Sequence, residues 1–126
     1  MFAAGARRRL NARHFLDGDF GEESVPHSHP YEIELVCRSQ TLDANGFSTD
    51  IAAMESALEK VLHDIDDVLL NDLSFFSRRQ PSLENLCIYL TTSLRSNLAG
   101  RGAEPDAPLE IRIWESDSAW ASYTEE

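Results

Sequence analysis

The chain has 126 residues, the usual length of one domain, and we expect residues 1–126 to fold as a single unit. Its formal net charge of −11 argues against general nucleic-acid binding, because contacts with phosphates need a basic surface. No stretch approaches the ~18 apolar residues of a membrane-spanning helix, and the N-terminus lacks an apolar signal core. We therefore expect a cytoplasmic protein without a membrane partner.

Two strands are predicted in the first third of the chain, at residues 7–15 and 31–38. In the second, odd-numbered residues are apolar and even-numbered residues are mostly charged, which is typical of a strand with one buried face. Residues 42–46 then form a turn, because Asn45-Gly46 favours the positive φ of a tight reversal.

Two helices follow, the first starting at Asp50 and the second at Pro81-Ser82, where Ser82 is the expected N-cap. Each carries apolar residues at helical spacing. These residues are Ile51, Met54, Leu58, Val61, Leu62 and Ile65 in the first helix, and Leu83, Leu86, Cys87, Leu90 and Leu94 in the second. The two cysteines, Cys37 and Cys87, both occupy apolar positions of periodic segments, so we expect them to be buried and unpaired.

Two short strands, residues 109–115 and 119–123, complete the chain. The order is therefore β-β-α-α-β-β, with a pair of strands at each end and a pair of helices between them. This order predicts an α+β fold in which a four-stranded antiparallel sheet carries both helices on one face.

Three of the four histidines fall on the predicted inward face of the first two strands. His27 and His29 continue the apolar parity of residues 31–38, and His14 shares the parity of the apolar residues before it. Positions two apart on a strand point the same way with Cα atoms ~6.6–7 Å apart, so these imidazoles can converge on one ion. Three histidines with an open fourth position form the arrangement of catalytic zinc. His63, late in the first helix, is expected to be solvated.

Glu115 is a second polar residue on a predicted apolar face, since it shares the parity of Leu109, Ile111 and Ile113. A buried carboxylate is costly unless it is paired or hydrogen-bonded. A ligand with two adjacent N–H donors, such as an aminopyrimidinone edge, would satisfy it. Alternatively, the strand has ended before Glu115 and its side chain reaches water. For the three histidines, the alternative to a metal site is that they are hydrogen-bonded residues of the core.

Six short motifs follow one another along the chain. The first two are Leu10-Asn11-Ala12-Arg13-His14 and His27-Ser28-His29-Pro30-Tyr31, the next three are residues 46–51, 65–71 and 81–86, and the last is Trp114-Glu115-Ser116. In chain order they are similar to F-x-A-x-H, H-G-H-x-Y, G-M-V-x-D-F, L-D-H-x-x-L-N, P-T-x-E-N-L and E-T/S. In this order and spacing the chain resembles the 6-pyruvoyl-tetrahydropterin synthase superfamily, which includes the 6-carboxytetrahydropterin synthases of the queuosine pathway. The resemblance covers nearly the whole chain.

This resemblance implies a T-fold, an antiparallel sheet with two helices on one face. It also implies a homo-oligomer, a hexamer built as a dimer of trimers or a smaller assembly, with sites for a small pterin-like substrate between subunits. It implies Zn²⁺ on His14, His27 and His29, Glu115 as the anchor of the pterin ring, and Glu84 as a further substrate contact.

The chain departs from the family at the residues expected to do the chemistry. Synthase-type members carry a catalytic cysteine shortly before H-x-H, whereas residues 21–26 contain none and offer Glu22 and Glu23 instead. The histidine of L-D-H is replaced by Asp67, while Asp66 is kept. Glutamate can act as a general base if burial or like charge raises its pKa from ~4.3. This chain resembles a branch with glutamate in place of the cysteine, which converts dihydroneopterin triphosphate to 6-hydroxymethyl-dihydropterin.

Three functions stay open at this point. The first is an active zinc-dependent lyase acting on a pterin side chain, with Glu23, Asp66 and Asp67 as catalytic residues. The second is a catalytically altered or inactive paralogue that binds a pterin- or purine-like ligand, and the third is a non-catalytic assembly protein. Arginines at 7–9 or at 78–79 are candidates for contacts with a triphosphate.

Overall fold

Four strands and two long helices follow one another along the chain in the predicted order β-β-α-α-β-β. The computed structural model describes residues 1–126. The elements are β1 (Phe2–His14), β2 (His27–Ser39), α1 (Ile51–Ile65), α2 (Leu83–Gly100), β3 (Glu110–Trp114) and β4 (Trp120–Thr124). Three 3-10 turns, η1 (Gly21–Ser24), η2 (Leu70–Asp72) and η3 (Ser74–Phe76), lie in the connections. Neither long helix combines the length and apolar character needed to cross a membrane.

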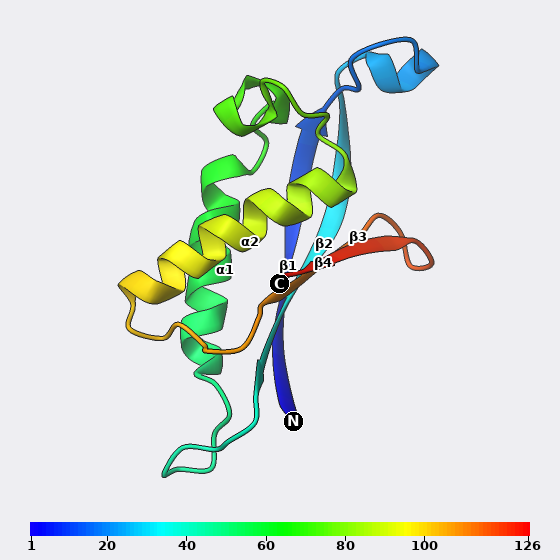
Figure 1. Cartoon of the computed structure of the whole chain (residues 1–126). Coiled ribbons are helices and arrows are strands. Elements are labelled where there is room, and N and C mark those ends of the chain that lie inside the picture. Colours follow the sequence, from blue (N-terminus) through cyan, green and yellow to red (C-terminus); the bar gives the residue numbers. More distant parts are fainter.

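The four strands form one antiparallel sheet, as the sequence predicts, and their order in it is β1-β2-β3-β4. β1 and β2 pair along their whole lengths, from Phe2 opposite Ser39 to His14 opposite His27. Along β2, β3 pairs only with the middle of the strand, and the last β2 residue that it reaches is Glu32. One end of the β1–β2 ribbon therefore extends beyond the rest of the sheet and ends at η1, far from the β2–α1 connection (Figure 1).

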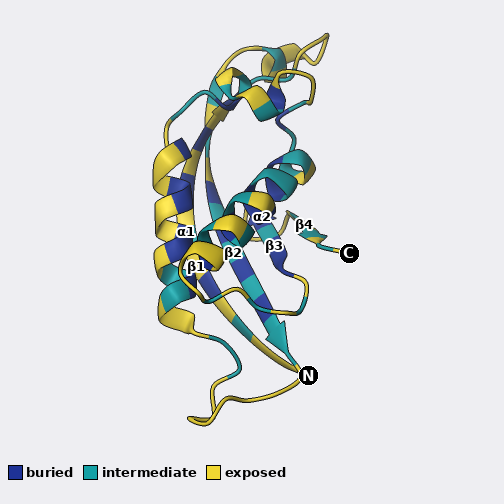
Figure 2. Cartoon of the chain, turned by 60° about the vertical axis from the view of Figure 1, so that its left-hand side comes forward, coloured by how far each residue is buried: buried dark blue, intermediate teal, exposed yellow.

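Both helices cover the same face of the sheet, with α1 against β1 and α2 against β3 and β4 (Figure 1). Each begins directly after its N-cap residue: Asp50 accepts a hydrogen bond from the Ala53 N–H at 3.0 Å, and Ser82, the expected N-cap, accepts one from the Asn85 N–H at 3.2 Å. The inward sides of helices and strands are buried, whereas the outer side of α1 is exposed (Figure 2). Burial of this apolar layer stabilises the fold.

The strand boundaries differ from the predicted ones because pairing between strands decides them. β1 begins at Phe2 although the sequence Ala3-Ala4-Gly5 lacks strand-forming residues, since these positions pair with the end of β2. The predicted strand at 109–115 ends at Trp114, because the next residue forms the β3–β4 turn. The predicted turn at 42–46 is confirmed, with Gly46 at a φ of 84°.

Candidate metal centre

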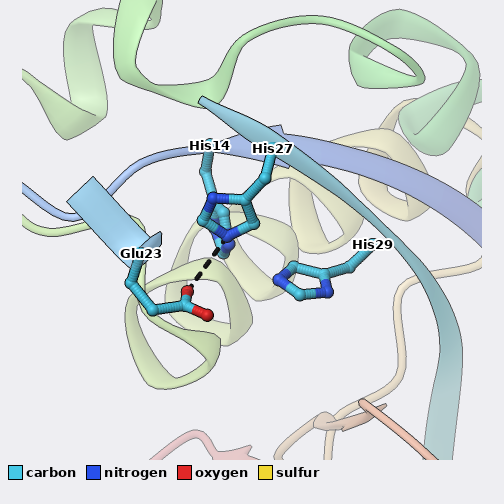
Figure 3. Close-up of side chains that lie close together, drawn as sticks. All are labelled: His14, Glu23, His27 and His29. Carbon is cyan, nitrogen blue, oxygen red and sulfur yellow. Dashed lines mark ion pairs between the residues drawn. The ribbon is translucent and has the colours of Figure 1, made fainter. Parts of the chain in front are cut away.

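Three histidine side chains meet at the projecting end of the β1–β2 ribbon. His14 is the last residue of β1 and lies opposite His27, the first of β2, while His29 points to the same side two residues later. The ring centroids lie 4.6 Å apart for His14 and His27, 4.7 Å for His27 and His29, and 5.2 Å for His14 and His29. The structure thus brings the three predicted metal ligands together (Figure 3).

Backbone carbonyl groups fix how two of these imidazoles present their nitrogens. The Nδ1 atom of His14 lies 2.9 Å from the carbonyl oxygen of Pro81, and that of His27 lies 2.6 Å from the carbonyl oxygen of Val25. A carbonyl oxygen only accepts, so Nδ1 is the donor in both contacts, and in the neutral ring Nε2 is then the nitrogen with the lone pair. Both Nε2 atoms are buried and have no hydrogen-bond partner.

This donor set fits a zinc ion. Buried polar atoms are normally hydrogen-bonded, so two unsatisfied nitrogens with free lone pairs indicate a missing ligand. Burial lowers the pKa of His14, and the neighbouring His27 and His29 lower it further, against the opposing contact with Pro81. The ring therefore stays neutral, which is the form that binds a metal. The outer hydrogen bonds from Nδ1 to carbonyl groups are those typical of zinc-bound histidines.

Glu23 completes the cluster from η1. Its Oε2 atom lies 3.0 Å from Nε2 of His27, and the candidate ligand atoms of Glu23 and the three histidines all lie within 4.8 Å of one another. Figure 3 shows the carboxylate approaching the imidazoles from the side of the turn. Of the two neighbouring glutamates, Glu23 faces the cluster, and Glu22 does not belong to it.

Two side-chain amides hold the segment between β1 and η1. Asn71 accepts a hydrogen bond from the Phe15 N–H and donates one to the Phe15 carbonyl oxygen, both at 3.0 Å. Gln80 does the same for Asp17, at 2.9 and 2.7 Å. The sequence pattern predicts neither role. Asn71 could have been noticed as the last residue of the motif at 65–71, whereas nothing in the sequence singles out Gln80.

The remaining predicted site residues lie outside the cluster. Asp66 accepts a hydrogen bond from the Asn11 N–H at 2.8 Å, and the Asp67 N–H donates one to the Asn11 carbonyl oxygen at 2.9 Å. Both acids therefore lie beside the free edge of β1. Asp67 has a φ of 60°, which is unusual and strained for a residue other than glycine. Glu84 is exposed in the first turn of α2.

The Glu115 carboxylate is exposed in the single chain, as in the alternative in which it reaches water. β3 ends at Trp114, and Glu115 is exposed in the turn that follows, where its N–H donates to the Ala119 carbonyl oxygen at 2.9 Å. This hydrogen bond continues the register of the β3–β4 pair by one residue. Burial raises the pKa of the inward-facing Tyr31, and the charge of Glu115 raises it further, so Glu115 lies near that face. The role of Glu115 in binding a ligand stays a prediction.

Solved structures of several proteins share this fold. One is 6-pyruvoyl tetrahydropterin synthase from Caenorhabditis elegans, with a TM-score of 0.83 at 20% identity, covering 99% of this chain and 96% of that one. Another is the Plasmodium vivax enzyme, with a TM-score of 0.75 at 18% identity, covering 100% of this chain and 99% of that one. That enzyme has also been solved as catalytic residue mutants in which a glutamate is replaced by alanine or cysteine.

Sequence comparison points to the same family. The 6-pyruvoyl tetrahydrobiopterin synthase of Drosophila melanogaster is 26% identical over 99 residues, which is 77% of this chain and 56% of the fly protein. The chain thus matches little more than half the length of that relative. The family model described as 6-pyruvoyl tetrahydropterin synthase matches residues 5–126. The chain therefore belongs to the 6-pyruvoyl tetrahydropterin synthase family.

Proposed function

We propose that this protein is a zinc-dependent lyase that processes the side chain of dihydroneopterin triphosphate or a related pterin, with Glu23 as its acid/base. The observation that carries this proposal is the position of Glu23, 3.0 Å from one of three convergent histidines. Those histidines present two buried nitrogen lone pairs that nothing in the chain satisfies. Membership of the family suggests the pterin class of substrate.

His14, His27 and His29 would hold the zinc ion through their ring nitrogens. When bound, zinc supplies Lewis-acid polarisation of the substrate oxygens beside the bond that reacts. The chain itself supplies the positions: Pro81 and Val25 orient two of the rings, and Tyr31 stacks on His29 with ring centroids 5.4 Å apart. The site thus orients the substrate side chain next to a carboxylate.

Glu23 would take a proton from the substrate side chain and later return it. Its side chain is 51% exposed, so a ligand that enters the cluster can reach the carboxylate. The family's catalytic cysteine is missing from residues 21–26, and Glu23 is the acidic group that approaches the histidines instead. The Plasmodium vivax enzyme, in which a glutamate is a catalytic residue, supports this role for Glu23.

We further propose a homo-oligomer, a hexamer or a smaller assembly, with the pterin site between subunits. Asp66 and Asp67 lie on the outer edge of β1, and Glu115 lies in the β3–β4 turn, so one chain does not gather them around its own metal centre. In such an assembly Glu115 would anchor the pterin ring and Glu84 would add a contact. Asp66 and Asp67 would assist proton transfer from a neighbouring subunit.

The alternative is a paralogue that binds a pterin- or purine-like ligand without the lyase reaction. Asp67 favours it, because this residue stands where the family motif has a histidine. The left-handed backbone of Asp67 does not explain this replacement, because aspartate and histidine are both enriched in that conformation.

The test is turnover of dihydroneopterin triphosphate by zinc-saturated protein, with products identified by mass spectrometry. Wild type should form a 6-hydroxymethyl or 6-pyruvoyl product. Glu23→Gln should lower turnover by about 10²–10⁴-fold, the usual contribution of a general acid or base. Glu22→Gln changes an acid on the same turn outside the cluster and should keep the activity. No product from wild type with stoichiometric zinc would refute the lyase, and full activity of Glu23→Gln would refute the role of Glu23.

A further inference from the structure

We propose that Glu23 is the fourth ligand of the metal in the resting protein, so that its carboxylate stays bound to the ion until another ligand displaces it. This inference rests on the proposed zinc site and adds a resting state to it. The family resemblance implies three histidines with an open position. The arrangement in this chain is different, because the fourth candidate ligand comes from the protein itself.

The distances suit a closed, four-ligand site. Zinc bonds of ~2.0–2.2 Å to nitrogen and oxygen in a tetrahedron place neighbouring ligand atoms about 3.3–3.5 Å apart. The ligand atoms of Glu23 and the three histidines lie within 4.8 Å of one another, and Oε2 of Glu23 lies 3.0 Å from Nε2 of His27. Small side-chain rotations would bring all four to one ion.

The carboxylate has no competing partner. Glu23 pairs with no arginine or lysine, and its 3.0 Å contact with Nε2 of His27 lacks the geometry of a hydrogen bond, since that nitrogen has no hydrogen-bond partner. Each carboxylate oxygen can accept hydrogen bonds or bind a cation, and acidic residues are common zinc ligands. Nothing in the chain therefore holds the Glu23 side chain away from a metal bound by the histidines.

The backbone of Glu23 is fixed where its side chain is free. The Leu16 N–H donates a hydrogen bond to the Glu23 carbonyl oxygen at 2.7 Å. The residues on either side of Leu16 are held by Asn71 and Gln80, as described above. The side chain, at 51% exposure, can still leave toward solvent. A fixed backbone with a movable carboxylate is what a displaceable ligand requires.

This arrangement would link substrate entry to the release of the base. While Glu23 occupies the fourth position, water and small anions are excluded from it. A substrate that takes the position frees the carboxylate beside its own side chain. The carboxylate leaves the metal in its deprotonated form and can accept one proton from the substrate.

The test uses protein loaded with Co²⁺, a metal that N/O sites bind in place of zinc and that reports its coordination in the visible spectrum. We expect millimolar azide to leave the spectra of wild type and of Glu22→Ala unchanged. Glu23→Ala should show a saturable azide-dependent spectral change, because its fourth position is open. Its Co²⁺ affinity should fall by about 10–100-fold, the range seen even for residues outside the ligand shell.

A wild-type spectrum that responds to azide as readily as that of Glu23→Ala would overturn the inference, and this result needs no variant to fold. Glu23→Asp, whose side chain is shorter by one methylene, should behave like Glu23→Ala and gives a second reading. Turnover separates the two proposals. If azide enters the wild-type site while Glu23→Gln loses turnover, Glu23 is a base and not a ligand. If the site is closed while Glu23→Gln keeps turnover, Glu23 is a ligand and not the base.

Discussion

Removing His14 should abolish the stabilisation of the fold by zinc. A metal that binds only the folded chain stabilises it by about 2.7 kcal/mol at 100 times its dissociation constant. An unfolding entropy of about 2.1 cal/mol/K per residue over 126 residues amounts to about 0.26 kcal/mol/K, so zinc should raise the melting temperature by about 10 °C. If loss of one ligand weakens binding about 100-fold, the same zinc concentration contributes only about 0.4 kcal/mol, or less than about 2 °C.

The assay is thermal unfolding of wild type and His14→Ala with and without zinc, at one protein concentration. The zinc-induced change is compared, and not the absolute melting temperature, because His14 is buried and its loss also removes a hydrogen bond to Pro81. His63→Ala is the matched control, since His63 is exposed on α1 outside the cluster. An equal zinc-induced shift in His14→Ala and wild type would refute the assignment of the histidines as ligands.

Three further predictions concern groups away from the metal. Burial alone would raise the pKa of Glu110, but hydrogen bonds from Arg112 and Arg38 outweigh burial and lower that pKa. The ionised carboxylate therefore stabilises the fold above pH 4.5, and this stabilisation is lost as the pH falls. Glu110→Gln should therefore cost about 1.5–3 kcal/mol in urea unfolding at pH 7, and progressively less as the pH falls below 4.5. Burial raises the pKa of Cys37 to about 11 and that of Cys87 to about 12, so neither should react with iodoacetamide until the chain is unfolded. Asn71→Ala should weaken zinc binding about tenfold in a chelator competition, because the segment next to His14 loses its support.

Alternation along the strands predicted that the histidines lie on inward faces, and the family resemblance implied that they share one zinc ion. His27 and His29 share the parity of the apolar residues of β2, and a strand holds such residues on one face. The sequence alone left the register between β1 and β2 open, because two strands joined by a long connection can pair in several ways. The structure resolves it by placing His14 directly opposite His27.

Residues that act from irregular segments were harder to predict. The orientation of Glu23 depends on η1, whose backbone is held by Leu16, and no periodicity applies to such a turn. Asn71 and Gln80 act on the backbone of residues distant in sequence, and a contact of that kind leaves no local pattern. Glu115 lies one residue past the end of β3 and is exposed, so alternation alone does not predict whether its carboxylate is buried.

The unequal lengths of the strands explain why a metal centre can form at this end of the sheet. β3 ends opposite Glu32, so residues 27–31 of β2 have no strand beside them on that side. A longer β3 would cover this edge of β2 and restrict access to His29. The overhanging ribbon keeps its shape because Asn71 and Gln80 bind the segment that follows β1, and Pro81 holds His14. The short outer strands thus leave room for a ligand, while side chains from the α1–α2 connection replace the support that a third strand would give.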